Sequence, residues 1–271
     1  MAQPAILPAS HGLLSMAIHV AIDCEFTDLL APELLSAGLV VVETGEECYV
    51  ELDLQSELGR ERQSKSRDFV KYGVLGFWGQ VNGAECDSEW TMGRRVGEWL
   101  LRQAEHHHGV TLLYDYSTDL ELLIEVLKEC NLWPQVRLVC SELYVGGETG
   151  TVAAEIAAEA CFRELRHRQP PLFRHHALAD ALALRDAWRT YQLTRTPDFV
   201  RLLNAAGGGL PGDRLVQSLQ AAREWETWLL EWLPTPAAAL GGRRPLDVVS
   251  EPGGVDVVEN ALSRTAHGTG K

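Results

Sequence analysis

Apolar residues with high strand propensity recur in three short runs near the start of the chain. The runs 17–22, 36–42 and 48–53 combine such residues, and Gly45 with its acidic neighbours marks a turn between the last two. Three successive strands with short connections favour antiparallel pairing. The pattern therefore predicts an antiparallel meander.

Beyond position 90 the apolar period changes to that of helices. Leu120, Leu123 and Leu127, for example, share one face of a helix predicted over 119–130. The other expected elements are a basic loop over 59–81, helices over 92–107, 151–167 and 177–191, and strands over 111–116 and 137–140. This order predicts an α/β fold with a mixed sheet, three antiparallel strands and then parallel strands, flanked by helices.

After Leu193 the pattern changes again. Glycines at 207–209 mark a flexible link, 214–233 forms one amphipathic helix with three tryptophans, and from Pro234 onward Pro, Gly and Ala dominate without a hydrophobic period. We therefore expect four parts, namely a disordered leader over 1–16, a domain over 17–193, a linker and amphipathic helix over 194–233, and a disordered tail over 234–271.

Composition and charge narrow the function classes. Hydrophobic residues make up 46% and charged residues 23%, which is typical of a globular protein. The 24 Lys and Arg residues against 38 Asp and Glu residues give a net charge of −14, whereas a protein that attracts nucleic acid by its overall charge is normally basic. No apolar run approaches the roughly 20 residues of a membrane span, and residues 1–18 lack the basic start of a secretory signal. We therefore expect a cytoplasmic protein without membrane contact.

Acidic residues stand where three predicted elements begin or end. Asp23 and Glu25 are two apart at the end of the first strand, so both point to one face, and Asp119 stands where a helix begins, a position that also suits a helix cap. Five residues span about 500° of a helix, so His175 and Asp180 converge only if His175 lies in the loop before the helix. Like charges held together in an apolar setting require a partner, and a metal ion is a suitable one.

In this order the motifs resemble those of the DEDDh group of 3′-5′ exonucleases, and most closely a compact bacterial 3′-5′ exoribonuclease-like branch. The run from His175 to Ala181 is similar to the third motif of that branch, with His176 in place of the usual Asn. The resemblance covers roughly residues 17–190. It implies a ribonuclease H-like fold.

The resemblance also implies a site. Two Mg²⁺ or Mn²⁺ ions about 4 Å apart would be held by four carboxylates, with His175 as general base; the carboxylates are Asp23, Glu25, Asp119 and Asp180. The position of a frequent Asn of the family falls on Asp115, which therefore stays an alternative to Asp119. Phe26 is a candidate to stack on a terminal base or to pack in the core, and Arg174 to hold a phosphate or to lie on a solvated face.

The implied function is that of a divalent-metal-dependent 3′-5′ exonuclease, an exoribonuclease that releases nucleoside 5′-monophosphates. Its partners would be single-stranded RNA or oligonucleotide 3′ ends, with DNA as an alternative substrate. A homodimer is a further expectation, because related exoribonucleases are often dimers and the tryptophan helix offers a surface. The alternative function is a catalytically inactive module that keeps the exonuclease fold and binds nucleic acid or protein.

Overall fold

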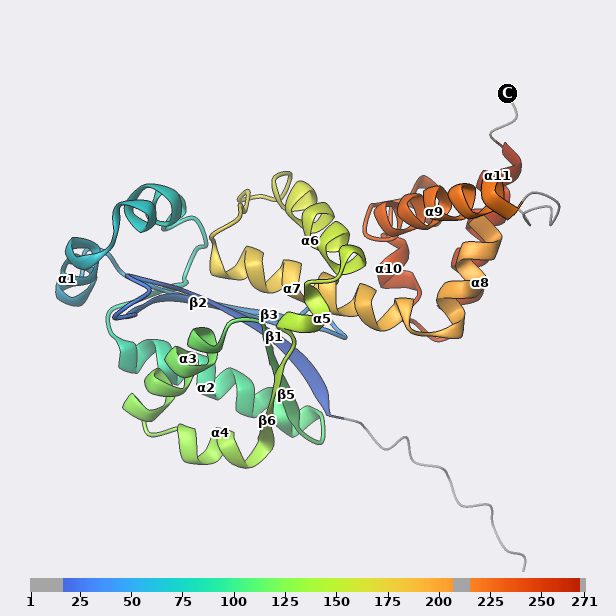
Figure 1. The fold of residues 1–271 in the computed structure, drawn as a ribbon. Coiled ribbons are helices and arrows are strands. Elements are labelled where there is room, and N and C mark those ends of the chain that lie inside the picture. The colour runs from blue at the N-terminus through green and yellow to red at the C-terminus, as the bar shows by residue number, and fades with distance from the viewer. Residues whose placement is uncertain (1–16, 207–214, 269–271) are drawn as a thin grey trace, which may run out of the picture.

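The computed structural model describes residues 17–206 and 215–268, with side chains for 17–206 and 224–264. We call residues 17–194 the sheet domain and the described residues from 197 to 268 the helical unit (Figure 1). The strands are β1 (Ile18–Phe26), β2 (Leu34–Val41), β3 (Glu47–Leu52), β4 (Glu85–Cys86), β5 (Val110–Tyr114) and β6 (Cys140–Tyr144).

Helices surround this sheet and make up the helical unit. Those of the sheet domain are α1 (Glu57–Lys65), η1 (Val70–Val74), η2 (Leu75–Phe77), α2 (Glu89–His106), α3 (Ser117–Glu129), α4 (Trp133–Val139), α5 (Gly146–Thr149), α6 (Val152–Leu165) and α7 (Ala177–Thr194). Those of the helical unit are α8 (Pro197–Ala206), α9 (Leu215–Trp232), η3 (Ala238–Leu240), α10 (Pro245–Val248) and α11 (Gly254–Gly268). None of the helices within residues 17–206 and 215–268 has the length and apolar content of a membrane span.

The sheet has the strand order β4-β3-β2-β1-β5-β6. Strands β1, β2 and β3 pair in antiparallel fashion, and β5 and β6 add in parallel beside β1. The predicted mixed sheet is therefore confirmed. The last strand, predicted over 137–140, instead follows α4 and begins at Cys140, because Pro134 suits the first turn of a helix and Val136 is fully buried.

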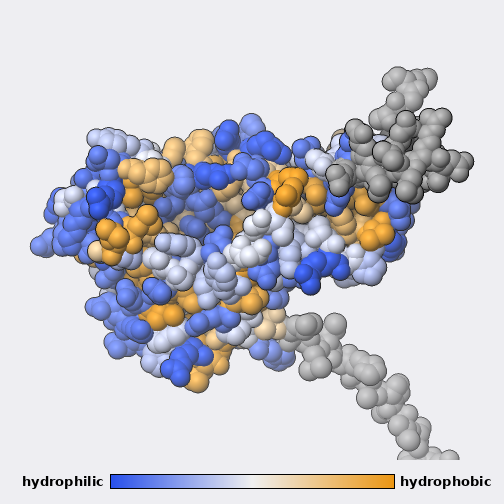
Figure 2. Space-filling view, viewed as in Figure 1, coloured by the Kyte–Doolittle hydropathy of each residue, from blue (hydrophilic) through white to orange (hydrophobic). Residues whose placement is uncertain are grey.

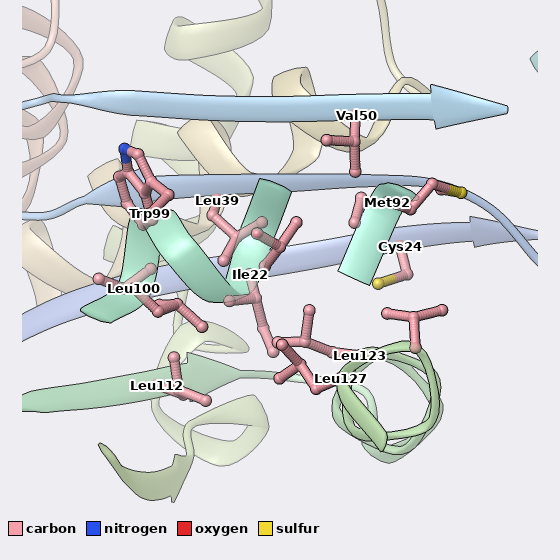
Figure 3. Close-up of a cluster of buried hydrophobic side chains, with 14 of the residues drawn as sticks. Ile22, Cys24, Leu39, Val50, Met92, Trp99, Leu100, Leu112, Leu123 and Leu127 are labelled. Atoms are coloured by element: carbon pink, nitrogen blue, oxygen red, sulfur yellow. The ribbon is translucent and has the colours of Figure 1, made fainter. Parts of the chain in front are cut away.

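The main hydrophobic core lies between the sheet and helices α2 and α3 (Figure 3). Ile22 on β1 and Leu112 on β5 pack against Leu100 of α2 and Leu127 of α3, and each is at most 1% exposed. Burial of one such side chain contributes roughly 1.5–3 kcal/mol to stability. This core fixes the position of β1, whose last residues carry Asp23 and Glu25.

Helices α6 and α7 cover the opposite side of the sheet (Figure 1). The start of α7 lies so close to β2 that a Cβ atom at Gly38 would be 2.3 Å from the carbonyl oxygen of Ala177. Only glycine permits this approach of two backbones. Because Gly38 is also paired with Asp23 in the sheet, the close contact places the first turns of α7 next to the acidic end of β1.

The segment predicted as a basic loop over 59–81 contains helical turns instead. The Ser56 side chain accepts a hydrogen bond from the Gly59 amide at 2.9 Å and so caps α1. The polar and basic composition of the segment suggested a loop, although this serine is a typical start of a helix. Most of its basic side chains are neutralised, with Arg62 bonded to Glu89 and Arg67 to Asp28. The described part of this segment therefore offers little free positive charge.

The predicted disordered tail over 234–271 is wrong for the residues that the structure describes. Leu246, Val258 and Leu262 are at most 1% exposed and form a second core with Leu202 of α8 and Leu229 of α9. Proline and two glycines at 252–254 interrupt the pattern between Leu246 and Val258, and the packing against α8 and α9 reveals the buried positions. The predicted linker is also helical in part, over α8. The predicted leader over 1–16 lies outside the described residues, as do 207–214.

A buried ion network joins the helical unit to α7. Asp186 is fully buried and accepts hydrogen bonds from Arg185 at 2.8 Å and, across the junction, from Arg244 at 2.5 Å. Arg189 reaches Asp247 at 2.8 Å. Asp247 lies in the first turn of α10 and Arg244 is the N-cap residue of that helix, so each part of the molecule supplies both signs of charge at the junction.

Candidate functional site

A pocket of about 840 Å³ opens at the carboxyl end of β1, between the start of α3, helices α6 and α7, and the η1 segment. The structure brings every sequence-predicted site residue to this pocket. They are Asp23, Glu25, Phe26, Asp115, Asp119, Arg174, His175 and Asp180. The sequence motifs thus identified residues that are neighbours in space, whatever their role.

The acidic side chains reach the pocket from three elements. Asp23 and Glu25 alternate on β1 and point to one face, as the strand period requires. Asp119 lies in the first turn of α3 and is only 2% exposed, and the Cys24 thiol donates to its carbonyl oxygen at 3.5 Å, which ties α3 to β1. Asp115, the alternative third carboxylate, precedes α3 and is exposed.

His175 lies in the loop before α7, where convergence with Asp180 requires it. Its backbone amide donates to Asp180 Oδ2 at 2.7 Å, and its φ of 64° is in the left-handed region. The ring of Phe69 stands edge-on to the imidazole with 5.0 Å between centroids. Ligand atoms of Glu25, His175 and Asp180 lie within 4.8 Å of one another, close enough to be considered as one metal site.

Burial and mutual repulsion raise the pKa values of these carboxyl groups. Burial is the largest cause for each, and it raises the pKa of Glu25 and of Asp119 to about 8 and that of Asp180 to about 7. The nearby charge of Asp180 adds to the effect of burial on Asp23 and Glu25, and the pKa of Asp23 is well above its usual range. Within the described residues, no Lys or Arg forms an ion pair with any of these groups. A nearby cation would favour the charged form of such a cluster of carboxyl groups.

The donor set fits a divalent cation. Carboxylate oxygens suit hard ions such as Mg²⁺ and Mn²⁺, and an imidazole nitrogen suits the transition metals. Burial lowers the pKa of His175, with a further contribution from Arg174, which favours the neutral ring that a metal requires. The residues able to hold an ion are Asp23, Glu25, Asp119, His175 and Asp180, with Asp115 at the edge.

The two predicted substrate contacts have structural partners within the chain. Phe26 packs against the main core and stacks on Tyr116 with 6.3 Å between ring centroids. Arg174 is paired with Glu159, and its guanidinium lies 4.5 Å from the ring centroid of Phe162. Contacts of Phe26 with a base and of Arg174 with a phosphate stay predictions.

Several apolar residues at the pocket were missed from the sequence. Leu29, Phe69 and Tyr144 line it and are 73%, 60% and 55% exposed. Phe69 belongs to the segment predicted as a loop, and Tyr144 to a strand that was placed too early. In the sequence, the available signal was an aromatic residue next to a loop or turn. Neither Phe69 nor Tyr144 belongs to a regular hydrophobic period that would have marked it.

The comparison with known families concerns the other end of the chain. The model of the antitoxin Xre/MbcA/ParS C-terminal toxin-binding domain matches residues 215–268, which comprise α9, η3, α10 and α11. This is about a fifth of the chain. No curated protein matches the sequence.

This match contradicts the predicted membership of the DEDDh exonuclease family. The exonuclease activity, the general-base role of His175 and the RNA 3′ ends as partners depended on that membership, and we do not retain them. The physical reason is that Asp-x-Glu and His-x₄-Asp are short patterns, which a sheet with acidic strand ends also produces without catalysis. By its description, the family that the helical unit resembles is characterised by the binding of toxins.

Proposed function

We propose that this protein binds a protein partner of the toxin class through its helical unit. The match of residues 215–268 to a toxin-binding domain carries this proposal. The packing supports it, since Leu229, Leu246 and Val258 belong to a core separate from that of the sheet domain. A helical unit with its own core offers a rigid surface, and rigid surfaces bind partners at a lower entropic cost.

Helix α11 supplies an exposed apolar residue for this contact. Val257 is 50% exposed beside Asp256, whose carboxylate is paired with Arg201 of α8 at 2.7 Å. Interfaces commonly combine an apolar centre with a polar rim. On the face shown in Figure 2, the hydrophobic residues that are coloured form separate patches rather than one continuous band.

Co-expression tests the proposal. We would co-express the full chain with toxins of the kinds that the matched family binds, and measure complex formation by co-elution and calorimetry. Val257→Asp is expected to weaken the complex, whereas Leu138→Asp serves as a matched control, because Leu138 is an 85% exposed residue of the sheet domain. Absence of a complex with every toxin, or equal weakening by both variants, would contradict the proposal.

A second function, divalent cation binding by the sheet domain, is supported by the unpaired acidic pocket. Asp23, Glu25, Asp119 and Asp180 would hold Mg²⁺ or Mn²⁺, with Asp115 as the alternative to Asp119. A bound cation would supply the positive charge that no described Lys or Arg brings to these side chains by an ion pair. Thermal unfolding with either ion and with a chelator tests this function separately from partner binding. The homodimer stays a prediction.

A further inference from the structure

We infer that the pocket contains a three-ligand site, formed by Glu25, His175 and Asp180, that selects first-row transition-metal ions over Mg²⁺. The inference rests on the proposed cation binding of the same pocket. It adds the imidazole of His175 as a ligand and states which class of ion the protein prefers.

The distances support a single ion shared by the three side chains. Their ligand atoms lie within 4.8 Å of one another. Ligands bound at about 2.1 Å from one ion are at most roughly 4.2 Å apart, so side-chain shifts of less than about 1 Å complete the site. Asp119, 2% exposed and also lining the pocket, forms no ion pair with a described residue and adds negative charge next to it.

The backbone prepares His175 for this role. Its left-handed φ of 64° is uncommon for a residue other than glycine, and the hydrogen bond from its amide to Asp180 maintains it. This hydrogen bond to Asp180 Oδ2, 2.7 Å long, fixes the loop, and a carboxylate has about four lone-pair sites, so Asp180 can bind an ion as well. Phe69 confines the imidazole from the side.

The neighbouring side chains do not provide a substitute for a metal. Arg174 lines the pocket, but its guanidinium is paired with Glu159 and lies over Phe162. His176 is 4% exposed, stacks on Tyr49 with 4.6 Å between ring centroids, and does not line the pocket. Of the two adjacent histidines, only His175 therefore faces the acidic groups.

The imidazole ligand determines which metal ion the site prefers. Mg²⁺ takes oxygen ligands and retains its water shell, whereas Mn²⁺, Co²⁺ and Zn²⁺ accept nitrogen ligands readily. A site with two carboxylates and one imidazole is expected to hold these ions more tightly than Mg²⁺. Without His175, the remaining oxygen ligands would discriminate much less.

Nitrogen coordination can be observed directly with the full chain and Mn²⁺. Electron spin-echo spectroscopy of the Mn²⁺-loaded protein is expected to show a histidine nitrogen, and labelling histidine with ¹⁵N should change that signal. Calorimetry with MnCl₂ and MgCl₂ should give a preference for Mn²⁺ of about tenfold or more, as expected for the loss or gain of one well-positioned ligand interaction.

The decisive variant is His175→Asn, because Asn also tolerates the left-handed conformation. It is expected to lose the nitrogen signal and most of the preference for Mn²⁺ while still binding Mg²⁺. His167→Ala, which removes an exposed histidine away from the pocket, should behave as the wild type. Mn²⁺ bound without a histidine nitrogen would overturn the inference and leave cation binding intact. Absence of binding of either ion would overturn both.

Discussion

Asp180 and Asp186 lie on the same helix, α7, six positions apart, yet their surroundings are opposite. Asp180 faces other carboxylates in the pocket, and burial raises its pKa to about 7. Asp186 is fully buried at the junction with the helical unit, where Arg185 and Arg244 outweigh the effect of burial and lower its pKa. Burial acts in the same direction on both groups, so the neighbouring charges decide the outcome.

The difference separates a structural charge from a binding charge. The chain itself supplies the partners of Asp186, and the junction is complete without any ligand. The described chain supplies no cationic partner for the carboxylates around Asp180. Unbalanced charge that the fold retains is a feature of sites for external ligands. The comparison leads to four predictions, from the largest expected effect to the smallest.

Asp186→Asn breaks the structural side of the comparison. Loss of this charge leaves the guanidinium groups of the buried Arg185 and the half-buried Arg244 without their shared carboxylate, which should cost about 3–5 kcal/mol of unfolding free energy. Urea denaturation followed by tryptophan fluorescence measures it. Asp198→Asn, at an exposed ion pair of 3.5 Å, is the control and should change stability by less than about 0.5 kcal/mol. A cost below that of the control would refute the structural role.

Asp180→Asn breaks the binding side. At a concentration 100 times its dissociation constant, Mn²⁺ should stabilise the wild type by about 2.7 kcal/mol. The variant should lose this gain because a ligand and its charge are removed, while its amide oxygen still accepts from the His175 amide. Thermal unfolding with Mn²⁺ and with chelator provides the measurement. Equal stabilisation of both proteins by Mn²⁺ would exclude Asp180 as a ligand.

Gly38→Ala tests whether the two sides depend on the same placement of α7. The added Cβ would meet the Ala177 carbonyl oxygen at 2.3 Å and displace the start of the helix, at a cost of about 1–3 kcal/mol. Because the start of α7 carries Asp180, the affinity for Mn²⁺ should fall as well. The junction lies further along α7, so the ion pairs of Arg244 should persist. Calorimetry measures the Mn²⁺ affinity and denaturation measures the stability. If the variant loses stability but keeps its Mn²⁺ affinity, the close packing of α7 on β2 does not determine the geometry of the pocket.

The pH dependence of stability tests the ion pairs of Asp247 at the junction. Burial raises the pKa of Asp247, but hydrogen bonds and charges of Arg244 and Arg189 together outweigh it and lower the pKa to about 2. Its contribution is therefore present above the usual pKa of about 4 and is lost as the pH falls toward 2. After allowance for its partial exposure we expect about 1 kcal/mol. Urea denaturation of Asp247→Asn and wild type should show a difference that shrinks toward zero between pH 5 and pH 2. A difference that persists at pH 2 would argue against this ion pair.

Much of the sheet domain was predictable from local pattern. Strand and helix periods around Ile22, Leu39 and Leu123 are regular, because each of these side chains must face one core. The acidic cluster was predictable for a similar reason, since Asp23 and Glu25 share a strand face and Asp180 has an apolar helix around it. The function attached to that cluster was wrong, because the same short motifs do not specify a reaction.

The helical unit was far less predictable. Its amphipathic helix was expected and corresponds to α9, but α10 and α11 were not. Proline and two glycines at 252–254 separate Leu246 from Val258 and Leu262, and all three are buried against residues of α8 and α9. A pattern within one short segment cannot report partners on other helices, such as Leu202 of α8, which lies more than 40 positions before Leu246.

The sequence by itself determined the mixed sheet, the strand faces and the acidic identity of the pocket, because these follow from periods of two and 3.6 residues and from side-chain chemistry. Tertiary structure alone decided that His175 lies within 4.8 Å of the ligand atoms of Glu25, that Asp186 is neutralised and Asp180 is not, and that the described residues beyond 234 fold. Each of these depends on contacts between distant segments, whose distances and charges local sequence does not encode.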